Sequence, residues 1–177
     1  MKTALVVGGA ACVWEDLARA RKLFEPDFTV LINDIGVFFP RYADLWVSYH
    51  PELLEAWALK RAKHNLPPVG KYGAGHPNAA PTFATTYHCK GGSSGMLGAW
   101  AALKEESTHV VLAGVPMDPS MSHFHNKKHG KPWVDGEHYL QHWLENEEKF
   151  RGRVKSLSGW TAEFLGQPTT QWLESDV

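Results

Sequence analysis

One stretch of the chain, residues 90–118, decides the expected fold, and its sequence is KGGSSGMLGAWAALKEESTHVVLAGVPMD. It predicts a glycine-rich loop, a helix over 96–104, a strand, and a turn that ends in Asp118. The apolar run VVLAG (110–114) is typical of a strand that is buried on both faces, as parallel strands usually are. Loop, helix and strand in this order indicate a parallel α/β unit.

The glycine-rich loop before this helix has the composition of an anion-binding site. Gly91, Gly92 and Gly95 allow the main chain to bend sharply and to approach a ligand closely. Ser93 or Ser94 can cap the helix, whose free N–H groups and positive dipole end then face the loop. Helix starts of this kind often bind phosphate. The alternative is a tight turn between two core elements, and serines and glycines alone do not decide between the two interpretations.

The whole-chain composition sets the class of protein. A length of 177 residues predicts one domain, residues 1–177, with a substantial core. The 18 basic residues nearly balance the 19 acidic ones, with 10 histidines in addition. Such a balance gives no electrostatic reason for nonspecific binding to nucleic acid or to an anionic membrane, so we expect neither partner.

The cysteines and the N-terminus indicate a cytoplasmic protein. Cys12 and Cys89 are too few for a disulfide framework and do not form a metal-type pair. The apolar run after the first three residues is too short for a signal peptide or a membrane span. Eight tryptophans exceed average usage. Most belong to the core on this interpretation, and any at the surface would mark a ligand face or a subunit interface, which leaves a homo-oligomer open.

The N-terminal half predicts three strands that end in polar or small residues. The run ALVV (4–7) meets Gly8 and Gly9 and is followed by helical spacing over 14–24. A second strand, 28–32, ends in Asn33 and Asp34, where a parallel strand delivers side chains to a ligand crevice. A plain turn explains Asn and Asp equally well. A third strand covers 44–50, and Pro51 opens the next helix. The glycine spacing of the dinucleotide fingerprint and the phosphate-loop lysine motif are both missing from the sequence.

Two segments are predicted to be irregular. Residues 65–92 contain many prolines and glycines and are expected to form one long loop, with at most a short strand at 82–88. Residues 119–138, which we call the lid, contain four histidines and three lysines. His123, His125 and His129 allow a metal-dependent hydrolase as one interpretation. The alternative, which we favour, has no metal ligand here and a basic lid that closes over a phosphorylated ligand.

The order of these elements predicts helices packed on a mainly parallel sheet, followed by a late helix over 137–150 and a last strand near Val154. Ligands bind such sheets beyond the carboxyl ends of the strands. This rule brings four separate segments to one rim. Their residues are Gly8 and Gly9, Asn33 and Asp34, Ser93, Ser94 and Gly95, and Met117 and Asp118.

The sequence resembles a known family at several short motifs. Most of the chain, in order, is similar to the Rossmann-like bacterial sialyltransferases that use CMP-sialic acid, and to a related nucleotide-binding group that includes the archaeal hydroxymethylpterin diphosphokinases. The segments that carry the resemblance are VVGGA (6–10), Asn33 with Asp34, SSG (93–95), the small helix residues Ala99, Ala101 and Ala102, and VLAGVPMD (111–118).

The resemblance implies a single Rossmann-like three-layer domain with a histidine-rich lid, and roles for several residues. The nucleotide would be bound by Gly8, Gly9, Asn33, Ser94 and Gly95. Asp34, Gly92 and Ser93 are adjacent to these residues in the chain and are expected to contribute to the same nucleotide site. His138, at the end of the lid, would correspond to the family's general base. Apart from the resemblance, the position of Asp118 after the last strand of this unit suggests that it orients the acceptor or helps to hold a divalent cation with the phosphates.

We therefore expect a transferase that acts on a nucleotide-linked substrate, by glycosyl or by phosphoryl or nucleotidyl transfer. Its partner would be a nucleotide or nucleotide-sugar, and a divalent cation is the one cofactor considered. Two alternatives remain open. One is a protein that binds or sequesters a nucleotide without chemistry, and the other is the metal-dependent hydrolase.

Overall fold

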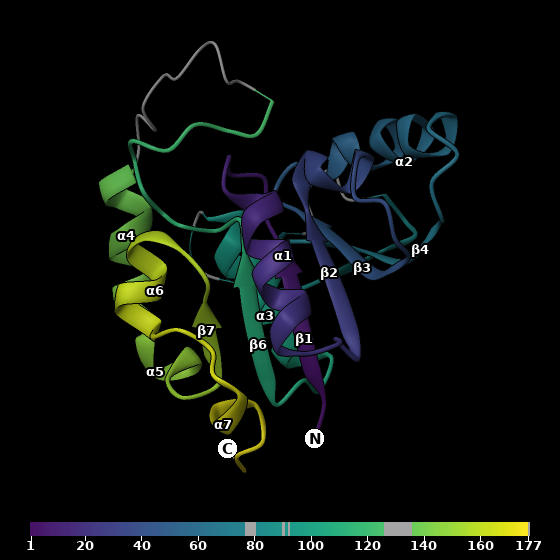
Figure 1. Ribbon diagram of the computed structural model, residues 1–177. Helices are drawn as coiled ribbons and strands as arrows, with labels where there is room; N and C mark the ends of the chain where they lie inside the picture. Colours follow the sequence, from purple (N-terminus) through teal and green to yellow (C-terminus); the bar gives the residue numbers. More distant parts are fainter. Residues whose placement is uncertain (77–80, 90, 92, 126–135, 177) are drawn as a thin grey trace.

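The computed structural model describes residues 1–76, 81–89, 91, 93–125 and 136–176. Seven parallel strands form one sheet in the order β5-β4-β3-β2-β1-β6-β7. Helices cover both faces of this sheet (Figure 1). The predicted class, a single Rossmann-like α/β domain in three layers, is confirmed.

The elements follow the chain with strands and helices in alternation over most of its length. In order they are β1 (Thr3–Val7), α1 (Val13–Leu23), β2 (Phe28–Ile32), the 3-10 helix η1 (Asn33–Val37), β3 (Ala43–Ser48), the 3-10 helix η2 (Pro51–Leu53), α2 (Leu54–Lys63), β4 (Val69–Ala74), β5 (Ala84–Thr86), α3 (Ser94–Lys104), β6 (His109–Ala113), α4 (Gly136–Glu145), α5 (Glu147–Phe150), β7 (Val154–Ser156), α6 (Gly159–Leu165) and α7 (Thr170–Leu173).

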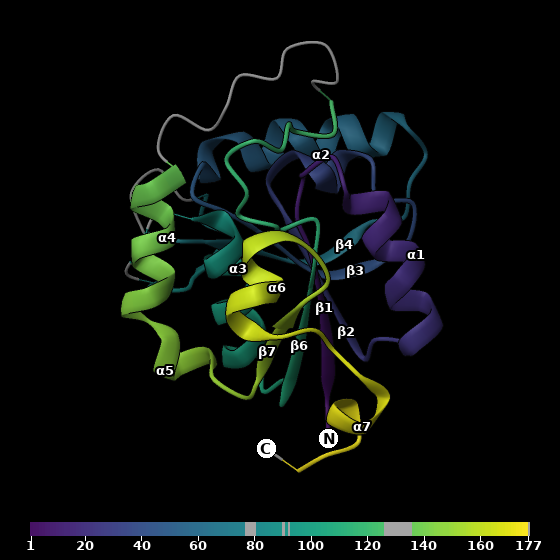
Figure 2. The same cartoon turned by 60° about the vertical axis from the view of Figure 1, so that its left-hand side comes forward.

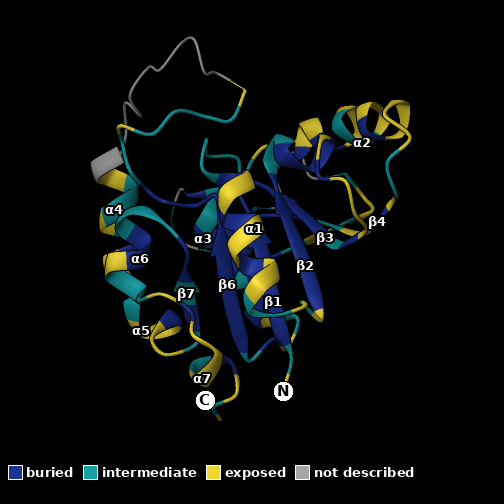
Figure 3. Cartoon of the chain, in the orientation of Figure 1, coloured by how far each residue is buried: buried dark blue, intermediate teal, exposed yellow. Residues whose placement is uncertain are grey.

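The three central strands are buried along their whole length. Every residue of β1, β2 and β6 is buried, which is why their sequences are continuous apolar runs rather than alternating ones. Figure 3 shows this buried centre and the exposed outer side of α1. In the register of the sheet, Val7 lies opposite Leu31 on one side and Ala113 on the other. The residues that follow β1, β2 and β6 therefore emerge at the same edge.

Alternate residues of the central strands belong to two different cores. Val6 and Leu112 pack with α3, which is itself largely buried. Val7 and Val111 pack on the side of α1 and α2. Figure 2 shows α3 and α4 on the opposite side of the sheet from α1. The position of α3 follows from its composition, because a helix that is apolar and small on most sides can lie flat against a sheet.

The stretch 65–92 departs from the sequence prediction because it contains β4, which pairs with β3. The short strand allowed at 82–88 is present as β5, which pairs with β4. The glycines of β4 do not interrupt the strand. A Cβ at Gly73 would lie 2.6 Å from the ring of Tyr87, so this glycine makes room for a buried aromatic side chain. The prediction of one irregular loop was wrong here, since the glycines reflect packing rather than a break.

A carboxylate at the end of α3 ties these two strands to the rest of the domain. Glu105 accepts hydrogen bonds from the Tyr87 hydroxyl at 2.6 Å and from the Lys71 ammonium at 2.5 Å. Lys71 belongs to β4, and Tyr87 follows β5. Burial alone would raise the pKa of the Glu105 carboxyl, but these two partners lower it below its usual value.

None of the helices in the part of the chain that the structure describes has the length and the apolar character to cross a membrane.

A buried arginine of α2 holds η1 and the segments that lead into β3 and β4. Arg61 is 2% exposed, and its guanidinium donates to the main-chain carbonyl oxygens of Gly36, Phe39, Arg41 and Pro67 at 2.6–2.8 Å. The planar fork with its five donors suits four carbonyl groups at once.

Replacing this arginine should destabilise the fold strongly. We expect Arg61→Met to lower the free energy of unfolding by about 3 kcal/mol, because it leaves buried carbonyl groups without donors. Arg61→Lys should recover little of this loss, since an ammonium lacks the fork geometry. Urea unfolding measures both, with the exposed neighbour Lys60→Met as the control. Equal midpoints for Arg61→Met and Lys60→Met would contradict this role.

Candidate functional site

A cavity of about 560 Å³ lies at the carboxyl ends of the central strands. These strand ends are at the end of the sheet away from the N-terminus (Figure 1). Its volume falls in the range of roughly 300–1,000 Å³ that small-molecule sites occupy. Its lining comes from segments after β1, β2, β3 and β6, from the start of α3, and from α4. The lining residues are Gly8, Gly9, Ala10, Ile32, Asn33, Asp34, Tyr49, His50, Ser93, Ser94, Gly95, Gly114, Val115, Pro116, Met117, Asp118, Met121, Ser122, His123 and Tyr139.

The structure brings together most of the residues that the sequence singled out. Eight of them line this one cavity: Gly8, Gly9, Asn33, Asp34, Ser93, Ser94, Gly95 and Asp118. Gly92 lies outside the described residues, as do residues 126–135 of the lid, including His129. His138 is described, and it is not among the lining residues.

The cavity floor is formed where the chain turns after β1 and after β6. The Gly8 N–H donates to the carbonyl oxygen of Ala113 at 2.8 Å, and the Ala10 N–H donates to that of Gly114 at 3.2 Å. A Cβ on Gly8 would collide with the Gly114 carbonyl, and Gly114 has φ +65°. Both positions therefore require glycine. The sheet order reverses between β1 and β6, so the two turns flank the switch point where open α/β sheets bind ligands.

A buried carboxylate holds the turn after β6 in place. Asp16, in α1, is 1% exposed and accepts hydrogen bonds from the Gly114 N–H at 2.9 Å and from the Ser158 hydroxyl at 2.6 Å. Cys12 is in contact with both side chains. Burial raises the pKa of the Cys12 thiol to about 11, so this cysteine is a neutral packing group rather than a nucleophile.

Asn33 is fixed at the end of β2 by three hydrogen bonds and adopts φ +52°. Its side-chain amide donates to the Ser94 hydroxyl at 3.1 Å, and its side-chain oxygen accepts from the Ser48 hydroxyl at 2.8 Å. The Trp46 indole N–H donates to its main-chain carbonyl at 2.6 Å. A non-glycine residue in the left-handed region is uncommon, and Asn is among those that tolerate it. These bonds position the Asn33 side chain between β3 and the start of α3.

The start of α3 points into the same cavity. Ser93 is the N-cap, and its hydroxyl accepts from the Met96 N–H at 3.1 Å and from the Trp143 indole at 3.3 Å. Ser94 and Gly95 come next and supply main-chain N–H groups that have no acceptor within the helix. Lysine and arginine do not occur among the described residues that line the cavity. An anion bound here would meet amides and a helix dipole rather than cationic side chains.

One wall of the cavity carries a cluster of two histidines and a carboxylate. The Nε2 atom of His123 lies 3.2 Å from Asp34 Oδ1, and that of His125 lies 3.4 Å from Asp34 Oδ2. Burial raises the pKa of the Asp34 carboxyl, but the hydrogen bond from His123 and the charges of both histidines outweigh it, so the pKa lies below its ordinary value. Burial lowers the pKa of His125 and outweighs the opposite effect of Asp34.

Of the two residues predicted to be catalytic, only Asp118 lines the cavity. Its Oδ1 atom accepts from the Ser120 hydroxyl at 2.7 Å and from the Ser120 N–H at 2.8 Å, which lower the pKa of this carboxyl. His138 is exposed in the first turn of α4, with its ring 4.2 Å from that of His142. The next residue, Tyr139, lines the cavity.

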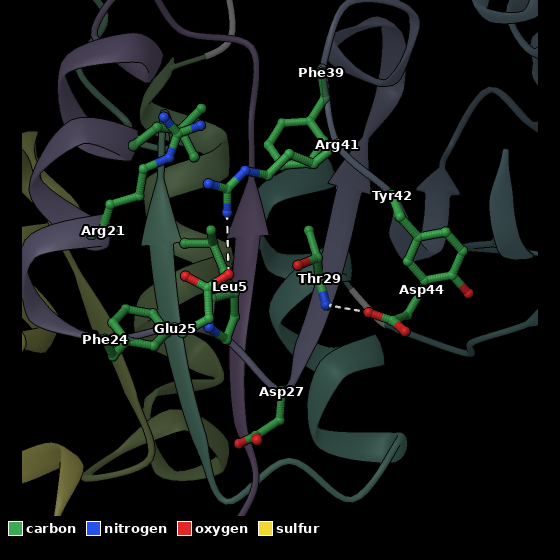
Figure 4. Close-up of a pocket in the computed structure, with 13 residues that line it drawn as sticks. Leu5, Arg21, Phe24, Glu25, Asp27, Thr29, Phe39, Arg41, Tyr42 and Asp44 are labelled. Atoms are coloured by element: carbon green, nitrogen blue, oxygen red, sulfur yellow. Dashed lines mark hydrogen bonds and ion pairs between the residues drawn. The ribbon is translucent and has the colours of Figure 1, made fainter. Parts of the chain in front are cut away.

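A second cavity, of about 340 Å³, lies between α1 and the segments that lead into β2 and β3 (Figure 4). Its carboxylates already have partners. Glu25 is paired with Arg41 at 3.1 Å, and Asp44 accepts from the Thr29 N–H at 2.8 Å. The candidate functional site is therefore the cavity at the carboxyl ends of the strands, where the segments singled out from the sequence converge.

The fold is shared with a solved glycosyltransferase. The chain is similar to the sialyltransferase CST-II, whose crystal structure was determined in complex with a trisaccharide acceptor and CMP. The TM-score is 0.64 at 13% sequence identity, over 99% of this chain and 89% of that chain. No family model and no curated protein matches the sequence. The sialyltransferase-like fold is thus confirmed, whereas the comparisons give no support to the predicted link with hydroxymethylpterin diphosphokinases.

Several lining residues were not predicted from the sequence. Tyr49 and His50 follow β3, and their position at a strand end was the one feature of the sequence that could have placed them in the cavity. Ser122 and His123 reach the cavity because the segment after β6 returns to the first glycine turn: the Ala11 N–H donates to the Ser122 carbonyl at 2.8 Å. A contact between residues more than a hundred positions apart leaves no mark in local sequence.

The buried carboxylate beneath the two turns offers a direct test of the cavity floor. Asp16→Ala should lower the free energy of unfolding by about 2–4 kcal/mol, because the Gly114 N–H and the Ser158 hydroxyl lose their shared acceptor. Urea unfolding measures the change, and Glu15→Ala, the exposed neighbour in the same helical turn, should stay within about 0.5 kcal/mol of the wild type. A comparable loss in both variants would show that the effect comes from the helix and not from this contact.

Proposed function

We propose that this protein is a transferase that binds a nucleotide-linked sugar in the cavity at the carboxyl ends of β1, β2 and β6. One observation carries the proposal: the segments after three strands and the start of α3 converge on a single cavity at the topological switch point. The similarity to CST-II, which was crystallised with CMP and a trisaccharide acceptor, supports the same class of ligand. Cytidine nucleotides are therefore the first ligands to test.

In this proposal the phosphate is held at the start of α3. The N–H groups of Ser94 and Gly95 would donate to its oxygens, and the helix dipole would favour the negative charge. The absence of lysine and arginine from the described lining makes these amides the main source of positive potential. Gly8 and Gly9 would let the nucleotide approach the main chain of the first turn closely.

Asn33 would recognise the base or ribose of the nucleotide. Its side chain is already oriented by Ser48 and Ser94, so little conformational entropy is lost when a ligand binds. Asp34, the next residue, forms the adjoining wall and pairs with His123.

His138 would accept the proton from the acceptor hydroxyl, and Asp118 would orient the acceptor. His138 is exposed at the start of α4, directly before Tyr139 in the cavity wall. An exposed imidazole is available to a substrate that enters from solvent, and a positioned base of this kind contributes about 10² to 10⁴ in rate.

A charge reversal at the start of α3 tests the phosphate site. Ser94→Asp should weaken CMP binding by roughly tenfold or more, because a carboxylate there repels the phosphate, while it leaves the helix as stable as before or more so. Ser94→Asn is the matched neutral control and should bind within a few-fold of the wild type. Calorimetry with CMP measures affinity, and thermal unfolding measures stability. Equal CMP affinity in the two variants would place the phosphate elsewhere.

Removing the proposed base separates catalysis from binding. His138→Ala should reduce transfer or hydrolysis of a CMP-sugar by about 10² or more while CMP affinity stays within a few-fold. His88→Ala, an exposed histidine outside the cavity, serves as the control. Product analysis after long incubation provides the readout. Tight CMP binding by a wild-type protein that leaves the CMP-sugar intact would favour the binding protein without chemistry.

A further inference from the structure

Two imidazoles converge on one carboxylate at the wall of the cavity. The three side chains belong to segments far apart in sequence: Asp34 lies in η1, and His123 and His125 lie in the segment after β6. The ligand atoms of all three lie within 4.8 Å of one another. The His123 Nε2 atom lies 3.2 Å from Oδ1 and the His125 Nε2 atom 3.4 Å from Oδ2, so each imidazole faces a different oxygen of the same carboxylate.

The surrounding structure holds these side chains in place from two directions. His123 forms an antiparallel bridge with Ala10, and the Phe124 N–H donates to the Gly9 carbonyl at 3.0 Å. Phe124 packs edge-on against Phe38, which follows η1, with ring centroids 5.6 Å apart. The ring of His125 lies 4.5 Å from that of Phe38. Ligands fixed by packing and by main-chain bonds are characteristic of preorganised sites.

Simple ion pairing does not account well for this arrangement. One protonated histidine would neutralise Asp34, and a second would place two positive rings side by side, with centroids 5.4 Å apart. Two neutral imidazoles can instead share one cation with the carboxylate, each through Nε2. The main-chain nitrogen of His125 lies 3.5 Å from the His123 Nδ1 atom. This long contact leaves Nδ1 free to carry the proton when Nε2 binds a cation.

We propose that Asp34, His123 and His125 form a binding site for a divalent transition metal ion such as Zn²⁺. Two imidazoles and one carboxylate suit zinc, cobalt or iron(II) rather than magnesium or calcium, which prefer oxygen ligands. Asp34 and His123 line the cavity, so the metal has an open coordination position toward bound ligands. The site does not depend on the proposed function, because metal binding is measurable without a nucleotide.

Titration of the full-length protein with metal alone tests the site. The protein is prepared without a histidine tag, treated with a chelator and titrated with Zn²⁺ in a calorimeter. We expect one saturable site per chain, and a loss of affinity of at least about tenfold in Asp34→Asn and in His125→Asn, because each removes a ligand. His88→Asn, which removes an exposed histidine elsewhere, should bind as the wild type does.

Two further readouts keep the result clear. Zn²⁺ should raise the unfolding temperature of the wild type and of His88→Asn but not of the two ligand variants, whose folding is verified by the same melts without metal. With Co²⁺ in place of Zn²⁺, azide should change the visible absorption spectrum if a coordination position is open. Absent saturable binding, or equal affinity in wild type and ligand variants, would overturn the site; a spectrum insensitive to azide would overturn its open position.

Discussion

The structure depends on the close approach of two main-chain turns at the switch point of the sheet. Gly8 and Gly114 face each other with no room for a side chain between them, and Asp16 holds the second turn from below through a buried charge-assisted hydrogen bond. Such a bond is stronger than a neutral one. This contact fixes the turns after β1 and β6 against each other. Since β2 pairs with β1 and α3 packs on both strands, the carboxyl end of β2 and the start of α3 lie at the same rim.

In the proposed function, a nearly neutral protein would bind an anion without help from lysine or arginine side chains. The described lining has no lysine or arginine, so the first N–H groups of α3 would supply much of the positive potential at the proposed phosphate position. The Ser93 hydroxyl, which caps the helix, accepts hydrogen bonds from the Met96 N–H and the Trp143 indole. The Ser94 hydroxyl accepts one from the Asn33 side chain. Neither hydroxyl therefore takes up the main-chain N–H groups of Ser94 and Gly95. The cap thus orders the start of α3 and leaves its first main-chain N–H groups, which have no acceptor within the helix, open to a ligand. An anion site without lysine or arginine would select its ligand by shape and by the direction of its hydrogen bonds more than by net charge.

Much of the fold could be predicted from the sequence, and the reasons are physical. The central strands are continuous apolar runs, since both of their faces are buried, and the carboxyl-end rule then places Asn33, Ser94 and Asp118 at one rim. The prediction was wrong for β4, because the space that Gly73 leaves for Tyr87 is visible only when both are in place. The convergence of Asp34 with His123 was beyond prediction for the same reason, since it requires the chain after β6 to return to the first turn.

The first glycine turn, Gly8 and Gly9, contacts both the turn at Gly114 and the side chain of His123. On one side Gly8 allows the contact with Gly114, and on the other a Cβ at Gly9 would lie 2.5 Å from the Nε2 atom of His123. The small size of Gly9 is thus required by the histidine as well as by any ligand above the turn. A substitution there would move His123 away from Asp34 and alter the cavity wall together with its floor. Because the wall and the floor share this residue, the position of the histidine cluster and the shape of the ligand cavity are set by the same piece of main chain.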